Sequence, residues 1–270
     1  MPAQRSLLWA LFFGAASLLA CKGVDKEPLV ESSPVIPLDP REELTSQGGI
    51  QFVAVFDPPV PAHSSSGSPL GEPAFWIGRF EVSVKDFEIF AKAMPAKARQ
   101  NFRSRFTPGG DYPVVEVSWW EARAFADWLS EQDNCTYRLP TVEEWRLAAR
   151  GQQTAGFPWK GPPKAGVHGN WGRVLNAPFF GAKPTLEPVG RFPAGDSWCG
   201  ASDMFGNATE WCAVPEARPE PRHLEPAMGD SWKSSRLEET SEPSWLDADS
   251  TYSFVGFRLI RTSRVCKPKG

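Results

Sequence analysis

The residues best suited to chemistry lie in one short segment, Asp203–Trp211, with the sequence DMFGNATEW. Within it, Asn207 and Glu210 place an amide oxygen and a carboxylate three residues apart. Oxygen atoms of this kind can bind a hard cation, cap a turn or pair with an arginine. Gly206 interrupts the segment, and Trp211 begins the next apolar piece. The elements around the segment therefore have to hold this amide and this carboxylate in place.

Other side chains with catalytic chemistry are scarce. The histidines are His63, His168 and His223, and neither His168 nor His223 has a carboxylate at helical spacing, so a histidine–carboxylate iron site is not expected. The absence of a CxxC motif and of a Cys/His cluster argues against a zinc site. The chain also lacks a glycine-rich phosphate loop and a Gly-x-Ser-x-Gly elbow. No common catalytic motif therefore stands out.

The N-terminal residues predict export. Residues 1–21 form a signal sequence in which Leu7–Leu19 is almost wholly apolar, too short for a transmembrane helix of about 20 residues. It ends in Leu-Leu-Ala-Cys, which resembles a bacterial lipoprotein signal with Cys21 as the lipidated residue. The alternative is an ordinary secretory peptide with a chance cysteine. Lys22 after the cysteine favours a lipid anchor in the outer membrane.

The rest of the chain is predicted to be a tether and one domain. Residues 22–47 are rich in proline and acidic side chains, a composition too polar to fold, and would span roughly 25–30 Å. Residues 48–270 form the domain. Across the chain, twelve Trp but three Tyr, with 27 Pro and 23 Gly, indicate a loop-rich fold with an aromatic core. The net charge of −3 and the lack of a basic run argue against a nucleic-acid partner.

Four cysteines remain for this domain once Cys21 is assigned to the lipid. They are Cys135, Cys199, Cys212 and Cys266. An even number in an oxidising compartment allows two disulfides with three connectivities, and the sequence does not choose among them. We favour a Cys199–Cys212 disulfide, because it would brace the Asp203–Trp211 segment.

Capping boxes mark the start of each predicted helix, since a serine or threonine is followed three residues later by an acidic residue. The pairs are Ser83 with Asp86, Ser118 with Glu121 and Thr141 with Glu144. The three helices should end near Ala93, Glu131 and Gly151. Apolar runs predict strands at 50–56, 75–82 and 254–260.

These landmarks follow one another in a recognisable order. They are EVS at 81–83, PVVEVSW at 113–119, RLPT at 138–141, EW at 144–145, AARG at 148–151, PW at 158–159, NW at 170–171, PVG at 188–190, the Asp203–Trp211 segment, GDSW at 229–232 and GFRL at 256–259. The series resembles the formylglycine-generating enzyme family, also called the sulfatase-modifying factor domain, over Gly48–Arg261. The resemblance implies an α+β, C-type-lectin-like fold that is loop-rich, with two main helices and small antiparallel sheets.

The resemblance also implies structural calcium, an ion that takes about six to eight oxygen ligands. Asn207 and Glu210 match one family site, completed by loop carbonyls. Asn170 and the carbonyl of Trp171 match a second, for which residues 176–187 offer no clear acidic ligand. The alternative is that Asn207 caps a turn and Glu210 pairs with an arginine.

Two kinds of redox centre occur in the family. The enzymes that oxidise a sulfatase cysteine hold copper on two thiolates placed between the GxSW and GFRL motifs, but here Gly229–Arg258 contains seven serines and no cysteine. We therefore expect no copper and no formylglycine-generating activity. The ergothioneine-type sulfoxide synthases hold non-haem iron on histidines that come mainly from a separate helical domain, which we do not expect in a chain of this length.

The missing thiolates and the predicted tether favour a non-catalytic binding or structural module, a pseudoenzyme attached to a membrane by lipid. Its partner would be an envelope protein or a glycan, contacted by exposed tryptophans such as Trp232 and Trp245. Most of the twelve tryptophans should nevertheless lie in the core. The alternative is a metal-dependent, non-haem iron oxidoreductase of the same superfamily, with a pocket near Trp232, Arg236 and Arg258.

Overall fold

The computed structural model describes seven stretches of the chain. They are residues 43–56, 73–94, 107–153, 156–172, 185–214, 223–238 and 242–266. The chain divides into units at 1–36 and 37–270, and all described residues belong to the second unit. The predicted signal sequence, Cys21, residues 22–42 of the predicted tether and His63 lie outside the described residues. No helix in the described stretches is both long and apolar enough to cross a bilayer.

The end of the predicted tether is part of the fold. Strand β1 (Glu43–Thr45) pairs antiparallel with β2 (Gln51–Val55). The backbone N–H of Gln47 donates to the Asp133 carboxylate at 3.1 Å. The prediction of a tether was therefore wrong for residues 43–47, because strand pairing supplies the order that their polar composition does not.

Five short strands form the first sheet, and all pairs in it are antiparallel. Their order is β1, β2, β3 (Phe75–Gly78), β9 (Ile260–Arg261) and β4 (Tyr137–Arg138). Strand β3 is shorter than the predicted 75–82, because its pairing with the C-terminal segment becomes irregular after Gly78. The Gly78 N–H donates to the Leu259 carbonyl, and the next such bond joins Val82 to Phe257.

The second sheet has four strands and carries the Asp203–Trp211 segment. Their order is β7 (Ser244–Asp247), β6 (Leu224–Met228), β5 (Thr209–Trp211) and β8 (Val255–Gly256). Strands β5 and β8 are parallel, and the other pairs are antiparallel. The predicted single strand at 254–260 is therefore two strands, β8 and β9, in different sheets. A side chain at Gly256 would collide with the Val114 carbonyl, so glycine permits the close approach at this point.

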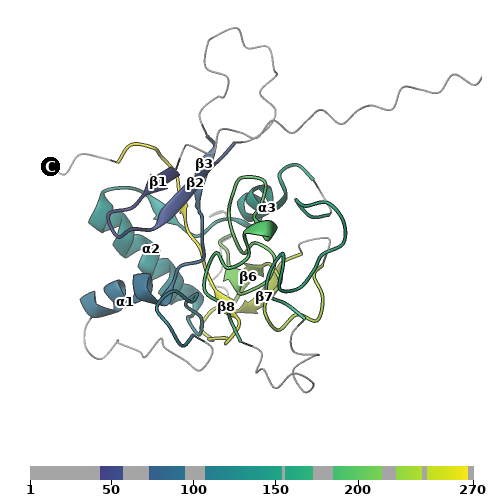
Figure 1. Ribbon diagram of the computed structural model, residues 1–270. Coiled ribbons are helices and arrows are strands. Elements are labelled where there is room, and N and C mark those ends of the chain that lie inside the picture. Colours follow the sequence, from purple (N-terminus) through teal and green to yellow (C-terminus); the bar gives the residue numbers. More distant parts are fainter. Residues whose placement is uncertain are drawn as a thin grey trace, which may run out of the picture. The chain divides into compact units, whose positions relative to one another are not determined.

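The three helices begin as predicted, with both hydrogen bonds of each capping box present. Helix α2 runs two residues beyond the predicted end and stops at Asn134 in the left-handed conformation. Figure 1 shows α1 and α2 side by side. The rings of Phe87 and Phe90 of α1 contact each other and the ring of Phe125 of α2. The helices are α1 (Val84–Ala93), α2 (Trp119–Asp133) and α3 (Val142–Arg150).

The Asp203–Trp211 segment runs between two hydrophobic clusters. Trp211 packs in the cluster formed largely by α1, α2 and their neighbours. Met204, Phe205 and Cys212 pack in the second cluster, with Trp145 of α3. The polar side chains of the segment therefore lie where the two apolar cores meet.

Candidate functional site

A fully buried ion pair joins Glu210 of β5 to Arg258, which lies between β8 and β9. Both side chains have no exposed surface. Arg258 Nε lies 2.6 Å from Glu210 Oε2, and Nη2 lies 2.7 Å from Oε1. Trp145 Nε1 also donates to Glu210 Oε2, at 2.7 Å. Two parallel charge-assisted hydrogen bonds of this kind are the strongest form of arginine–carboxylate contact.

Arg258 also binds the backbone of two distant segments. Its Nη1 donates to the Gly78 carbonyl at 2.9 Å, and its Nη2 donates to the Ser202 carbonyl at 2.9 Å. Burial alone would lower the pKa of Arg258, but the Glu210 carboxylate raises it above its usual value. The guanidinium thus remains charged and connects β3, β5 and the start of the Asp203–Trp211 segment.

Asn207 organises the loop on the other side of this pair. Its Nδ2 donates to Glu81 Oε2 at 2.9 Å, while the Ala208 N–H donates to Glu81 Oε1 at 2.9 Å. Its Oδ1 accepts from the Glu187 N–H at 3.0 Å and from Asn170 Nδ2 at 3.2 Å. Asn207 has φ of 64°, a left-handed conformation that asparagine tolerates better than most residues. Its amide is thus used to fix a turn.

Three buried carboxyl groups, those of Glu81, Asp203 and Glu210, interact electrostatically with Arg258. Burial raises the pKa of Glu81 well above its usual value, and the negative charges of Asp203 and Glu210 raise it further. Burial raises the pKa of Asp203 to about 6, although its hydrogen bond from the Gly190 N–H acts in the opposite direction. Excess negative charge in an interior of low dielectric constant makes proton uptake favourable.

The side chains as arranged do not fit calcium at Asn207 and Glu210. Both Glu210 oxygens accept hydrogen bonds, and a cation beside them would face the Arg258 guanidinium. Asn207 Oδ1 already accepts two N–H groups. The arrangement instead matches the alternative considered from the sequence, a turn fixed by Asn207 and an arginine paired with Glu210. Calcium binding at these residues stays a prediction for titration.

The second predicted calcium site has one unsatisfied oxygen. Asn170 is buried, its Nδ2 donates to the Thr185 carbonyl at 2.9 Å, and its Oδ1 has no hydrogen-bond partner. Its carbonyl accepts the Asn207 N–H at 2.9 Å, so the two predicted sites share one network. Trp171 is buried in the second hydrophobic cluster. Within the described stretches, no three His, Cys, Asp or Glu side chains are grouped to hold a metal.

The predicted pocket of Trp232, Arg236 and Arg258 was wrong. Trp232 is buried, with Nε1 donating to the Ser253 carbonyl, and so is not the exposed contact residue we expected. Arg236 is exposed and pairs with Glu238 at 3.1 Å, whereas Arg258 lies in the interior. Trp245, the other predicted contact residue, is 44% exposed.

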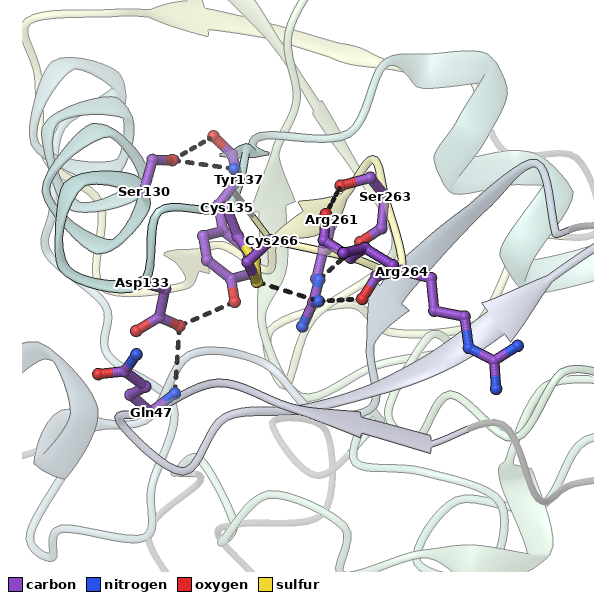
Figure 2. Close-up of a disulfide and its surroundings, with 10 residues drawn as sticks. Gln47, Ser130, Asp133, Cys135, Tyr137, Arg261, Ser263, Arg264 and Cys266 are labelled. Carbon is purple, nitrogen blue, oxygen red and sulfur yellow. Dashed lines mark hydrogen bonds between the residues drawn. A yellow bond between two sulfur atoms is a disulfide. The ribbon is translucent and has the colours of Figure 1, made fainter. Parts of the chain in front are cut away.

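The predicted Cys199–Cys212 disulfide was also wrong. Cys135 is bonded to Cys266 instead (Figure 2). Cys199 and Cys212 are free. The Cys199 thiol donates to the Ala148 carbonyl of α3, whereas the Cys212 thiol turns back to the Glu210 carbonyl. Burial raises the pKa of both free thiols, so they remain protonated and unreactive.

The sequence reading did not assign roles to Glu81, Asp203 or Trp145. Glu81 lies between Phe80 and Val82, and a charged residue between two apolar ones that follow a strand is a signal of a buried polar network. Trp145 carried no comparable signal, because its role depends on how α3 packs against β5.

A family model described as the sulfatase-modifying factor enzyme 1-like domain matches residues 44–263. The chain is 33% identical over 170 residues to hercynine oxygenase of Mycobacterium tuberculosis, a match that covers 55% of this chain and 36% of that protein. Matches to two further hercynine oxygenases cover 22% and 21% of those proteins. The chain therefore spans about a third or less of these first relatives.

Two other relatives have different names. An inactive C-alpha-formylglycine-generating enzyme 2 of Bos taurus is 34% identical over 110 residues, covering 38% of this chain and 33% of that protein. Chaperone protein LppX of Paenibacillus barcinonensis is 27% identical over 235 residues, covering 70% of this chain and 80% of that protein. Among solved structures, PvdO from Pseudomonas aeruginosa has the same fold, with a TM-score of 0.60, 19% identity, and coverage of 82% of this chain and 98% of that one.

Proposed function

Because the chain belongs to the sulfatase-modifying factor enzyme 1-like family, we propose that it is a non-catalytic binding or structural module of the cell envelope, attached to a membrane by lipid on Cys21. The family domain supplies a rigid loop scaffold. In this chain the central polar residues are used to hold that scaffold together.

The state of the domain cysteines carries the proposal. Copper on the formylglycine-generating enzymes needs two thiolates, and thiolates form where cysteines are partly exposed in an electropositive environment. Here Cys135 and Cys266 are joined to each other, while partly buried Cys199 and buried Cys212 donate to different carbonyls, those of Ala148 and Glu210. Burial raises the pKa of both free thiols, which disfavours the thiolate form. While the Cys135–Cys266 disulfide is closed, no two of these four cysteines offer a pair of thiolates to copper.

The envelope location rests on the N-terminal sequence and on one relative. Leu-Leu-Ala-Cys at 18–21 ends a signal of lipoprotein type. The likeness to Chaperone protein LppX runs over most of both chains, which favours an exported protein over a glycan as the partner. Lys22, the residue after Cys21, favours attachment to the outer membrane.

The absence of catalysis is tested directly by a peptide oxidation assay. The purified chain, supplied with copper(I), oxygen and a sulfatase-derived cysteine peptide, should leave the cysteine unchanged by mass spectrometry. A formylglycine-generating enzyme assayed alongside serves as the positive control. Conversion of the peptide by this chain above the rate of free copper would overturn the proposal.

Lipid attachment is tested separately in cells. Radiolabelled palmitate should be incorporated into the wild-type chain and found in the membrane fraction. Cys21→Ser should remove the label and release the chain in soluble form, while Cys199→Ser, at a free cysteine inside the domain, should keep the label. Equal labelling of wild type and Cys21→Ser would refute the anchor.

The likeness to hercynine oxygenases supports a second candidate, a non-haem iron oxidoreductase. His168 stacks on Trp159, with ring centroids 4.4 Å apart, and its Nδ1 accepts the Lys164 N–H. His223 is exposed at the start of β6. In the part of the chain described, neither imidazole belongs to a group of three His, Cys, Asp or Glu side chains that could hold a metal, so we rank this candidate second. Stoichiometric bound iron would reverse the order.

A further inference from the structure

The Cys135–Cys266 disulfide ties the end of the described chain to the edge of the first sheet. Cys135 lies in the turn between α2 and β4, and Cys266 lies five residues after β9. The two Cα atoms are 4.5 Å apart, although 131 residues separate them in sequence. Figure 2 shows the bond between the turn that precedes Tyr137 and the segment 263–266, which follows Arg261.

Arg261 binds both the sulfur and the turn next to it. Its Nη2 lies 3.2 Å from Cys266 Sγ and also donates to the Arg264 carbonyl. Its Nε donates to the Ser263 carbonyl at 2.7 Å. Arg261 as a whole is 5% exposed, so its charge is only weakly screened by water. A cation held at this distance stabilises the thiolate form of a cysteine.

The two cysteine residues differ in their exposure to solvent. Cys135 is buried, whereas Cys266 is partly exposed and follows Val265, which is 80% exposed. A reductant can therefore approach the bond from the Cys266 side. Strand β9 pairs with β3 and β4 through backbone contacts that do not involve either cysteine.

We propose that the Cys135–Cys266 disulfide is a redox latch, which a dithiol reductant opens to release segment 263–266 while the rest of the domain stays folded. Because the bond also closes a long loop, the competing view is a purely structural crosslink. The two views differ in whether the reduced domain keeps its fold.

The reaction is a two-step thiol–disulfide exchange. A thiolate of the dithiol attacks Cys266 Sγ and forms a mixed disulfide, and the bonding electrons leave on Cys135 Sγ, which takes a proton. The second thiol of the reductant then attacks its own sulfur in the mixed disulfide and releases Cys266 as a thiolate beside Arg261. In sum, the protein gains two electrons, and the reductant is oxidised to its own disulfide.

The test uses the full chain equilibrated with mixtures of reduced and oxidised dithiothreitol. Maleimide labelling with mass spectrometry should show Cys135 and Cys266 opening together, while near-ultraviolet circular dichroism stays native. Trypsin should then cut after Arg264 at least about tenfold faster than in the oxidised protein, since opening removes local protection. Loss of the native spectrum together with reduction, or an unchanged cutting rate, would overturn the proposal.

Two variants separate the latch from a general loss of stability. Cys135→Ser/Cys266→Ser should behave as the open form without any reductant, with native circular dichroism and fast cutting after Arg264. Arg261→Gln removes the charge beside Cys266 and should need about threefold more reduced dithiol at pH 8, the effect of losing a tenfold stabilisation of the thiolate. The Arg261→Gln variant is compared with wild type at an unchanged melting temperature of the oxidised form. If its reduction midpoint does not shift, Arg261 does not stabilise the Cys266 thiolate.

Discussion

At the scale of single residues, the charge of Arg258 is balanced inside the protein. The guanidinium is bonded to Glu210 and also faces Glu81 and Asp203, which leaves excess negative charge in a buried volume. An ion pair between Glu210 and some arginine could be considered from the sequence, because a carboxylate in an apolar segment needs a partner. Which arginine it would be was not visible, because Arg258 lies 48 residues away and was assigned to a pocket.

Breaking this pair should be costly. Glu210→Gln removes the carboxylate that is hydrogen-bonded to buried Arg258 and should lower the free energy of unfolding by about 3–5 kcal/mol in urea denaturation. Arg236→Ala, which removes an exposed pair with Glu238, is the matched control and should change it by less than about 1 kcal/mol. Similar losses in both variants would contradict the central role given to the buried pair.

Asp203 should make stability depend on pH in a defined direction. Its folded-state pKa of about 6 lies above the unfolded value of 3.8, so the folded protein binds the proton more tightly. This contribution is greatest below pH 3.8, decreases as the pH rises towards 6, and is absent above that. Asp203→Asn keeps an acceptor for the Gly190 N–H but cannot titrate.

The stability difference between Asp203→Asn and wild type should therefore change with pH. We expect the free energy of unfolding of the variant, relative to that of wild type, to increase by up to about 3 kcal/mol as the pH rises from 4 to 7. Urea unfolding at several pH values measures this difference. Groups that do not interact with Asp203 cancel in the difference, whereas Glu81, whose pKa the Asp203 charge raises, contributes to it. A difference that is constant over this range would show that Asp203 does not take up a proton on folding.

At the scale of elements, local signals predicted well and long-range ones did not. Each capping box uses residues three apart, so the starts of α1, α2 and α3 could be predicted from the sequence alone. The division of 254–260 into β8 and β9 could not, since the apolar run is continuous and the break arises from the partners of each half. The prediction of the disulfide was wrong for a related reason, because the pairing of Cys135 with Cys266 depends on contacts between segments far apart in the sequence.

Gly206 shows how the Asp203–Trp211 segment depends on close packing. It has φ of 109°, and a Cβ there would lie 2.8 Å from the Asn170 carbonyl oxygen. Gly206→Ala should therefore destabilise the domain by at least about 3 kcal/mol, because strain and collision add. Gly200→Ala is the control for backbone strain alone, because Gly200 has φ of 86° and a Cβ added there would meet no other group within 4 Å. This substitution should lower the free energy of unfolding by about 1–2 kcal/mol. Equal melting temperatures for the two variants would rule out the collision.

The helix starts allow a further test. Ser118→Ala removes the hydroxyl that accepts the Glu121 N–H at 3.2 Å and should lower the free energy of unfolding by about 1 kcal/mol. Ser235→Ala, at an exposed residue outside any helix, should have almost no effect. A Ser118→Ala protein as stable as wild type would mean that the cap contributes little to α2.

At the scale of the whole molecule, the family and the α+β fold could be predicted from the order of many weak motifs. The family match and the likeness to PvdO confirm both. Function is harder to predict, since it depends on side chains that the fold does not fix. The residues of the Asp203–Trp211 segment would serve a structural role equally well in a catalyst and in a binding module.

The metal content of the native protein tests the central claim most directly. The full chain is incubated with copper(I) and iron(II) kept reduced by ascorbate without added thiol, so that the Cys135–Cys266 disulfide stays closed, and is then desalted. It should contain neither copper nor iron in stoichiometric amount by mass spectrometry. A formylglycine-generating enzyme treated in the same way should keep its copper. Calcium in this chain would be compatible with a structural module. One equivalent of copper or iron per chain would contradict the account of a non-catalytic domain.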